Sequence, residues 1–164
     1  MGALEVILVV LGIVAFVVFG TIVSSKKSKK LRESGKTVAR ANNFHRYIYY
    51  FTTSVGDFSA ISAAIDVNLL RTMKISVKLD IPGGRIVFQM RRRLFVAALQ
   101  REGPRDEVYV YSFGFLNCKE SVGGWLEGDD SANALLTAVE RAFMHVDPYA
   151  TVESAQAAFK ERFF

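Results

Sequence analysis

The stretch that decides the fold class is MKISVKLDIPGGRIVFQM, residues 73–90. Apolar and polar residues alternate through its first half, and this period of two is typical of a strand with one buried and one exposed face. Pro82, Gly83 and Gly84 supply turn residues, after which the alternation resumes from Arg85 to Met90. Parallel strands are covered on both faces and lack the polar half, so the pattern predicts an antiparallel hairpin.

Three more segments have the aromatic and β-branched composition of strands. They are residues 44–53, 94–100 and 107–116. The segment 94–100 and the hairpin are separated only by Arg91–Arg93. A single strand from 85 to 101 would be roughly 55 Å long at about 3.3 Å per residue, so we expect a turn or a bulged bend near Arg92. The residues EGPRD at 102–106 predict the next turn.

Helical spacing occurs in three places. The first predicted helix covers 57–70; it is capped by Ser54 or Asp57 and has one apolar face, formed by Phe58, Ile61, Ile65 and Leu69. The second covers 131–146 and is capped by Ser131 or Asp130. The last begins at Thr151, and its apolar stripe is Val152, Ala155, Phe159 and Phe163. The order is strand, helix, four strands and two helices. We therefore predict a two-layer α+β domain in which three helices cover one face of about five antiparallel strands.

The N-terminal stretch from Val6 to Val23 holds no charge, amide, histidine or proline. Twenty residues from Val6 cover roughly 30 Å as a helix, the thickness of the hydrocarbon layer of a bilayer. A cleaved signal peptide is disfavoured, because no basic residue precedes the run and no Ala-x-Ala site follows it. We predict a transmembrane helix within residues 1–25.

Five basic residues follow this helix within a few positions. They are Lys26, Lys27, Lys29, Lys30 and Arg32. Lys and Arg beside a transmembrane helix stay on the cytoplasmic side, so we expect a single-pass protein of a bacterial plasma membrane with its N-terminus outside. The single cysteine, Cys118, agrees with a reducing compartment. The five side chains either contact anionic headgroups, at about 1 kcal/mol each, or only fix the topology.

Residues 26–43 are predicted to form a basic juxtamembrane segment and linker, in which Gly35 ends the helix, and residues 44–164 one cytoplasmic domain. The formal net charge of the chain is +5, and residues 41–164 hold fourteen Lys or Arg and fourteen Asp or Glu. The excess charge therefore lies on the tether and not on the domain. This disfavours nucleic acid as a partner.

The catalytic inventory is small. Cys118 and His145 could form a nucleophile and base pair, although an incidental thiol is more ordinary. Asp129 and Asp130 could chelate a cation, but two acids at the start of a helix more often stabilise its N-terminus. We expect no enzyme activity, cofactor or metal site.

Two function classes remain open. The first is a non-catalytic cytoplasmic interaction domain that binds another protein or copies of itself, with Trp125 as a possible contact. The alternative is a domain that binds a lipid or a small apolar ligand between its helices and its sheet. Arg91–Arg93 either contacts an acidic partner or the membrane, or forms a solvated bend. A cavity of several hundred Å³ under the helices would favour the ligand. The sequence does not predict the oligomeric state.

Overall fold

The computed structural model describes residues 26–122, 124 and 126–156. The described residues up to Thr37 and those from Val38 onward form two separate compact units. Within the described part of the chain, no helix is both long and apolar enough to cross a membrane. The predicted transmembrane segment, residues 1–25, lies outside the described residues.

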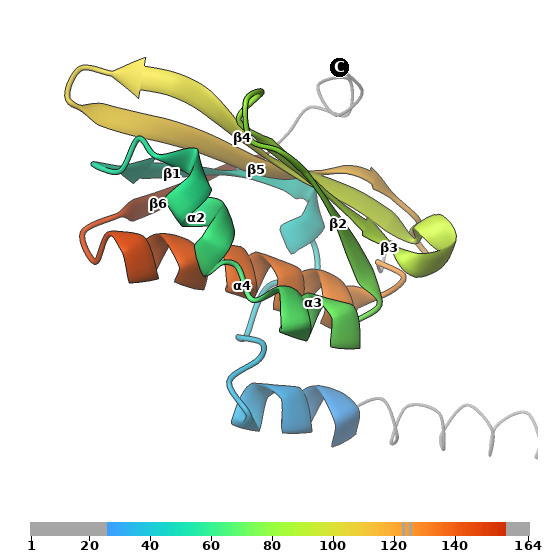
Figure 1. Cartoon of the computed structure of the whole chain (residues 1–164). Coiled ribbons are helices and arrows are strands. Elements are labelled where there is room, and N and C mark those ends of the chain that lie inside the picture. Colours follow the sequence, from blue (N-terminus) through green and yellow to red (C-terminus); the bar gives the residue numbers. More distant parts are fainter. Residues whose placement is uncertain (1–25, 123, 125, 157–164) are drawn as a thin grey trace, which may run out of the picture. The chain divides into compact units, whose positions relative to one another are not determined.

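The second unit is built on a six-stranded antiparallel sheet with the strand order β2-β3-β4-β5-β1-β6 (Figure 1). Its strands are β1 (Tyr47–Thr53), β2 (Ile75–Asp80), β3 (Arg85–Met90), β4 (Phe95–Arg105), β5 (Val108–Cys118) and β6 (Thr151–Gln156). The predicted hairpin is β2 and β3, in which Ile75 pairs with Met90 and Asp80 with Arg85. The antiparallel sheet predicted from the alternation is thus confirmed.

Helices lie on one face of this sheet (Figure 1). They are α2 (Phe58–Ala64), α3 (Val67–Thr72) and α4 (Asp129–Val146), and two 3₁₀ turns, η1 (Phe44–Arg46) and η2 (Arg91–Arg93), precede β1 and β4. In the first unit, residues 26–33 are helical. As predicted, Gly35 ends that helix: it has a φ of 69°, and the Lys36 amide donates to the Leu31 carbonyl.

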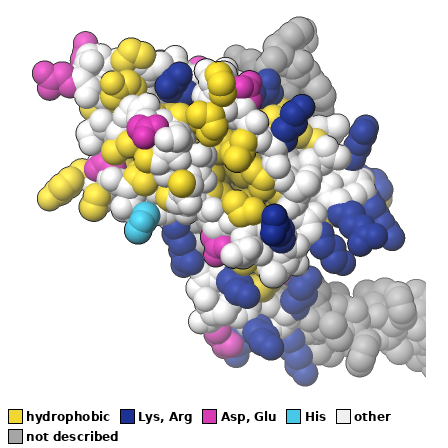
Figure 2. All heavy atoms as spheres, viewed as in Figure 1, with side chains coloured by type: hydrophobic (Ala, Val, Ile, Leu, Met, Phe, Trp, Pro, Cys, Tyr) yellow, Lys and Arg dark blue, Asp and Glu magenta, His cyan; other side chains and the backbone are white. Residues whose placement is uncertain are grey.

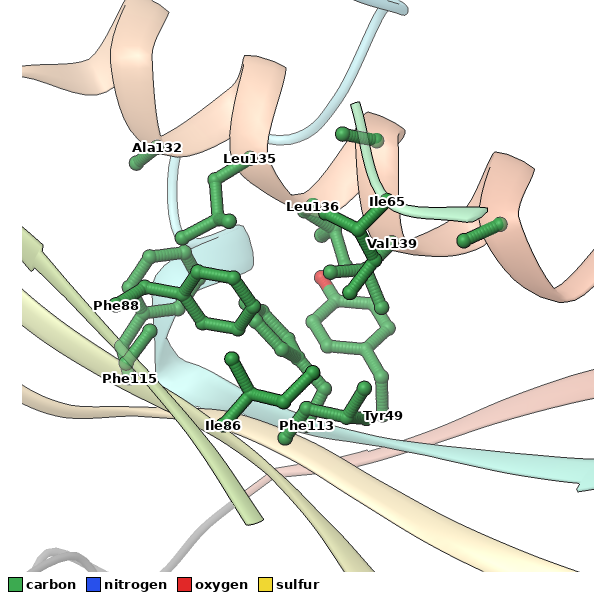
Figure 3. Close-up of a cluster of buried hydrophobic side chains, with 14 of the residues drawn as sticks. Tyr49, Ile65, Ile86, Phe88, Phe113, Phe115, Ala132, Leu135, Leu136 and Val139 are labelled. Carbon is green, nitrogen blue, oxygen red and sulfur yellow. The ribbon is translucent and has the colours of Figure 1, made fainter. Parts of the chain in front are cut away.

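The core lies between the sheet and α4, and aromatic rings fill much of it (Figure 3). Phe51 and Phe143 stack with ring centroids 4.3 Å apart. Phe88 and Phe113 point from the sheet toward Leu135 on α4. Side chains of this size bury a large apolar area each, so this layer supplies most of the stabilisation of the domain.

The single helix predicted over 57–70 is wrong, because the chain forms two short helices there. Ile65 has extended backbone, and Asp66 starts α3 by accepting a hydrogen bond from the Leu69 amide. Asp57, and not Ser54, caps α2 through the Ser59 amide. The spacing of Phe58, Ile61 and Ile65 fits one continuous helix because all three side chains are buried, although the helix ends before Ile65.

The predicted last helix is also wrong, because Thr151–Gln156 is a strand, β6. It pairs antiparallel with β1, where Tyr49 faces Ser154 and Phe51 faces Val152. β1 otherwise pairs only with β5, so β6 satisfies backbone groups along its second edge. Val152 and Ala155, expected on a buried stripe, are exposed. Phe159 and Phe163 lie outside the described residues.

Of the two turns predicted on either side of β4, one is confirmed and one is shifted. Arg91–Arg93 does separate two strands, as expected, through η2. The turn expected at 102–106 instead occupies Asp106 and Glu107, because a register shift between Arg101 and Gly103 lets β4 continue to Arg105. Gly103 has a φ of 119°, which only glycine adopts easily.

Candidate functional site

A groove lined by positive charge runs between α3, the start of β2 and η2. It has a volume of about 510 Å³, and Arg71, Lys74 and Arg91 line it together with Val67 and the first residues of β2. The Arg91 amide donates to the Lys74 carbonyl at 2.9 Å, which holds the two segments together. We call Arg71, Lys74 and Arg91–Arg93 the basic surface.

All five side chains of the basic surface are exposed. Among the described residues, none of them has a carboxylate oxygen within 4.0 Å of its charged nitrogen atoms. Lys and Arg side chains gather over the end of the molecule that holds η2 and the start of β2 (Figure 2). The domain as a whole is formally neutral, so positive charge is concentrated on this surface and balanced by acidic residues elsewhere in the domain.

The backbone of the basic surface adopts an unusual conformation. Lys74 and Arg92 both have a φ of 62°, and Arg93 has a φ of 52°. Among the described residues only one other non-glycine residue, Asp106, has a positive φ. A left-handed conformation costs roughly 1 kcal/mol or more for a long side chain, whereas glycine adopts it freely.

A second hollow lies on the face of the sheet that carries none of the helices in the described part of the chain. Ala98 on β4 pairs with Gly114 on β5, and these two small residues form its floor. The hollow has a volume of about 310 Å³. Its apolar walls are Ile48, Tyr50 and Leu116, and its polar rim includes Arg85, Gln100, Glu102, Arg105 and Ser112. We call this region the open-face hollow.

An ion-pair cluster fixes the loop after β5. His45 is fully buried, and its Nε2 lies 2.7 Å from Glu120 Oε1. Arg46 donates to both oxygens of the same carboxylate, at 3.1 and 2.9 Å. Hydrogen bonds from Arg46, and then from His45, lower the pKa of Glu120 to about 2. Glu120 also forms a β-bridge with Leu126, so the base of this loop is held. Trp125, the predicted partner contact, lies outside the described residues.

The structure does not bring Cys118 and His145 together. Cys118 pairs with Phe95, and Phe95 packs against Gly128 at the start of α4. His145 lies in the last turn of the same helix, which has 18 residues and spans about 27 Å. The two residues therefore lie at opposite ends of α4, and they cannot act as a nucleophile and base in this geometry.

Asp129 and Asp130 form the first turn of α4, and Gly128 is the N-cap in place of the predicted Asp130 or Ser131. Two carboxylates in this turn favour the helix through its dipole. No group of three or more His, Cys, Asp or Glu residues in the described ranges could hold a metal ion.

The five basic residues predicted to contact headgroups lie on the helical residues 26–33 of the first unit, and all five are exposed. Lys29 forms an i,i+4 pair with Glu33 at 3.9 Å. Such a pair between exposed side chains contributes little stability and leaves the lysine accessible. The geometry of this segment is thus compatible with headgroup contact.

Comparison of the chain with protein-family models, with curated proteins and with solved structures found no match. The interpretation of the basic surface and the open-face hollow therefore rests on their own geometry. Sequence reasoning singled out Arg91–Arg93 but missed Arg71 and Lys74. The hairpin register was the available signal, since Ile75 opposite Met90 places Lys74 beside Arg91.

Proposed function

We propose that the chain is a single-pass membrane protein whose cytoplasmic domain is a non-catalytic interaction module for another protein. The membrane anchor is supported by the uncharged stretch from Val6 to Val23 and by the basic residues that follow it. The observation that carries the interaction role is the contrast between the two faces of the sheet: one is packed with rings, and the other is hollowed and open.

The packed face disfavours a buried lipid or small ligand. A ligand pocket needs several hundred Å³ between the helices and the sheet. Aromatic rings occupy this layer, with Phe51 stacked on Phe143 and Phe58 stacked on Tyr111 at 6.0 Å. Binding there would have to displace close-packed side chains, which costs several kcal/mol.

The open-face hollow has the features of a protein contact. Its floor and walls are apolar, and its rim carries charges of both signs, such as Arg85 and Glu102. An apolar centre with a polar rim is the usual anatomy of a protein interface. The hollow is large enough to receive one apolar side chain, which is how an interface anchor binds. The proposed partner is therefore a protein that inserts such a side chain.

The experiment is site-specific photocrosslinking in membranes. A photoreactive phenylalanine analogue replaces Tyr50 at the hollow in one form of the full chain, and Met144 on α4 in the control form. Met144 is 47% exposed, so both positions are accessible. We expect a discrete protein adduct from position 50 and none from position 144. Equal labelling at both positions, or adducts with lipid alone, would contradict the proposal.

A filling variant tests the same surface. A Cβ at Gly114 meets only Ile48 Cγ1, at 3.6 Å, which is an ordinary contact, so the position accepts a side chain and Gly114→Val would occupy part of the hollow. Valine suits a strand better than glycine, and we expect stability to be kept. The adduct from position 50 should then disappear. If it persists in Gly114→Val, the hollow is not the contact.

A further inference from the structure

We propose that the basic surface binds the phosphate groups of anionic lipids in the membrane that holds the anchor. This inference rests on the proposed function, because the anchor is what places the domain beside lipid. The ligand is a membrane surface and not a soluble anion. The surface would thereby set which way the domain faces, while the open-face hollow remains available to a protein partner.

The charge state of these side chains is the first argument. Three basic residues elsewhere in the domain form ion pairs: Arg40 with Glu140, Arg46 with Glu120, and Lys119 with Glu127. The other described basic residues of the domain outside the basic surface are unpaired as well, but they do not share one groove and one turn: Lys78, Arg85, Arg101, Arg105 and Arg141. The five cations of the basic surface have no such pairing among the described residues. They share one groove and one turn, so they repel one another unless an anion lies between them. Phosphate groups supply that anion, and Arg binds phosphate with a fork of donors.

The backbone is the second argument. A turn that only reverses the chain between β3 and β4 is made most easily by glycine or asparagine in the left-handed conformation. Arg92 and Arg93 occupy that conformation instead, as does Lys74 on the other side of the groove. Unfavourable backbone at three basic positions of one surface points to a role for the side chains. The cluster is therefore not accounted for by the needs of the turn.

The third argument is the mixed character of the groove. Val67 is 37% exposed and lines it together with Arg71 and Lys74. An apolar side chain beside cations suits the membrane interface, where headgroups meet the first methylene groups of the acyl chains. A soluble acidic protein or a nucleic acid would meet a domain that is formally neutral as a whole, so the long-range field that would attract it is weak.

Chain length makes the contact attainable. The helical residues 26–33 cover about 12 Å, and four further residues reach at most about 14 Å before Val38. If the chain leaves the bilayer near Ser25, the domain begins within about 26 Å of the lipid surface. Tethering at such a distance raises the effective concentration of headgroups, so individually weak contacts suffice.

The test measures amide hydrogen exchange in the full chain, reconstituted in nanodiscs of phosphatidylcholine alone or with about 30% phosphatidylglycerol. We expect slower exchange at residues 71–76 and 90–95 in the anionic discs, by about tenfold at the Arg91 amide. The difference should vanish near 1 M salt, where the Debye length falls to about 3 Å. Equal exchange in the two discs at low salt would overturn the proposal. So would equal slowing by millimolar inorganic phosphate in neutral discs, which would assign a soluble anion.

Two double variants separate this role from a structural one. In Arg92→Gly with Arg93→Gly, we expect the effect of anionic lipid to be lost while the thermal unfolding midpoint stays equal to or above that of the wild type. The matched control, Arg101→Gln with Arg141→Gln, removes the same charge from other exposed positions and should keep the effect. Loss of the effect in both variants, or in neither, would contradict a specific surface.

The experiment also distinguishes failure of this inference from failure of the proposed function. Chains that alkaline carbonate releases from membranes would contradict the anchor itself. Chains that resist carbonate but exchange equally in both discs would leave the anchor in place and refute only the lipid contact.

Discussion

The side chain of Arg40 is expected to fasten the first residues of the domain to α4. Its Nε donates to Asn133 Oδ1 at 3.1 Å and its Nη1 to Glu140 Oε1 at 3.0 Å. Its Nη2 donates to the second carboxylate oxygen of Glu140 and to Thr137 Oγ1. The side chain of Arg40 is 12% exposed. Arg40→Met removes the charge and all of these donors while it keeps the apolar part of the side chain.

The expected loss lies between two limits. Breaking a fully buried ion pair costs about 3–5 kcal/mol because it leaves an uncompensated charge, whereas an exposed pair is worth about 0–1 kcal/mol. The side chain of Glu140 is 24% exposed, so water compensates it in part. We expect Arg40→Met to lower the free energy of unfolding by about 2–3 kcal/mol. In a double-mutant cycle with Glu140→Gln, we expect a coupling of about 1–2 kcal/mol.

The assay is urea unfolding of the full chain in detergent, followed by the near-ultraviolet circular dichroism of the aromatic core. Arg141→Met is the matched control, because Arg141 is exposed on the same helix, and it should change the free energy by less than about 0.5 kcal/mol. The reasoning fails if Arg40→Met costs no more than this control. It also fails if the coupling energy with Glu140→Gln is close to zero.

Three further changes test the fold. Phe143→Ala removes the ring that stacks on Phe51 and should cost about 3–5 kcal/mol in urea unfolding; a loss below about 1 kcal/mol would mean that this layer is not closely packed. Asp66→Ala removes the cap of α3 and should cost about 1 kcal/mol, with Asp66→Ser retaining most of the stability in the same assay. Hydrogen bonds from the Thr53 hydroxyl and then from two backbone amides lower the pKa of Asp147 from 3.8 to about 2, so its ionised form stabilises the fold above about pH 3.8. The wild type should therefore exceed Asp147→Asn in stability at neutral pH, and the gap should close as the pH falls from 3.8 through about 2; a gap independent of pH would refute the assignment.

The sequence predicted those elements whose structure is specified by residues close to them in the chain. The β2–β3 hairpin followed from alternation around one turn, and α4 followed from its apolar stripe. β6 could not be predicted in this way, because Val152 and Ala155 also fit a helical stripe. Its strand conformation depends on the free edge of β1, far away in the sequence, and no local pattern carries that information.

The candidate surfaces divide in the same manner. Part of the basic surface could be predicted from the sequence, because Arg91–Arg93 is contiguous and the hairpin register places Lys74 beside it. The open-face hollow could not be predicted from the sequence, because it forms only where Ala98 pairs with Gly114 on the neighbouring strand. That pairing depends on a register shift between Val96 and Ala97, which neither strand indicates by itself.

The position of β1 has a consequence for how the chain acquires its fold. β1 is the first strand made, yet Tyr49 finds its cross-strand neighbours only in Phe113 and Ser154. Pairings so distant in sequence are slow to form, and the strand carries exposed aromatic residues until they do. During synthesis, YIYYFTT therefore stays unpaired until β5 and β6 have been made. We expect this interval to be when the protein most needs a chaperone.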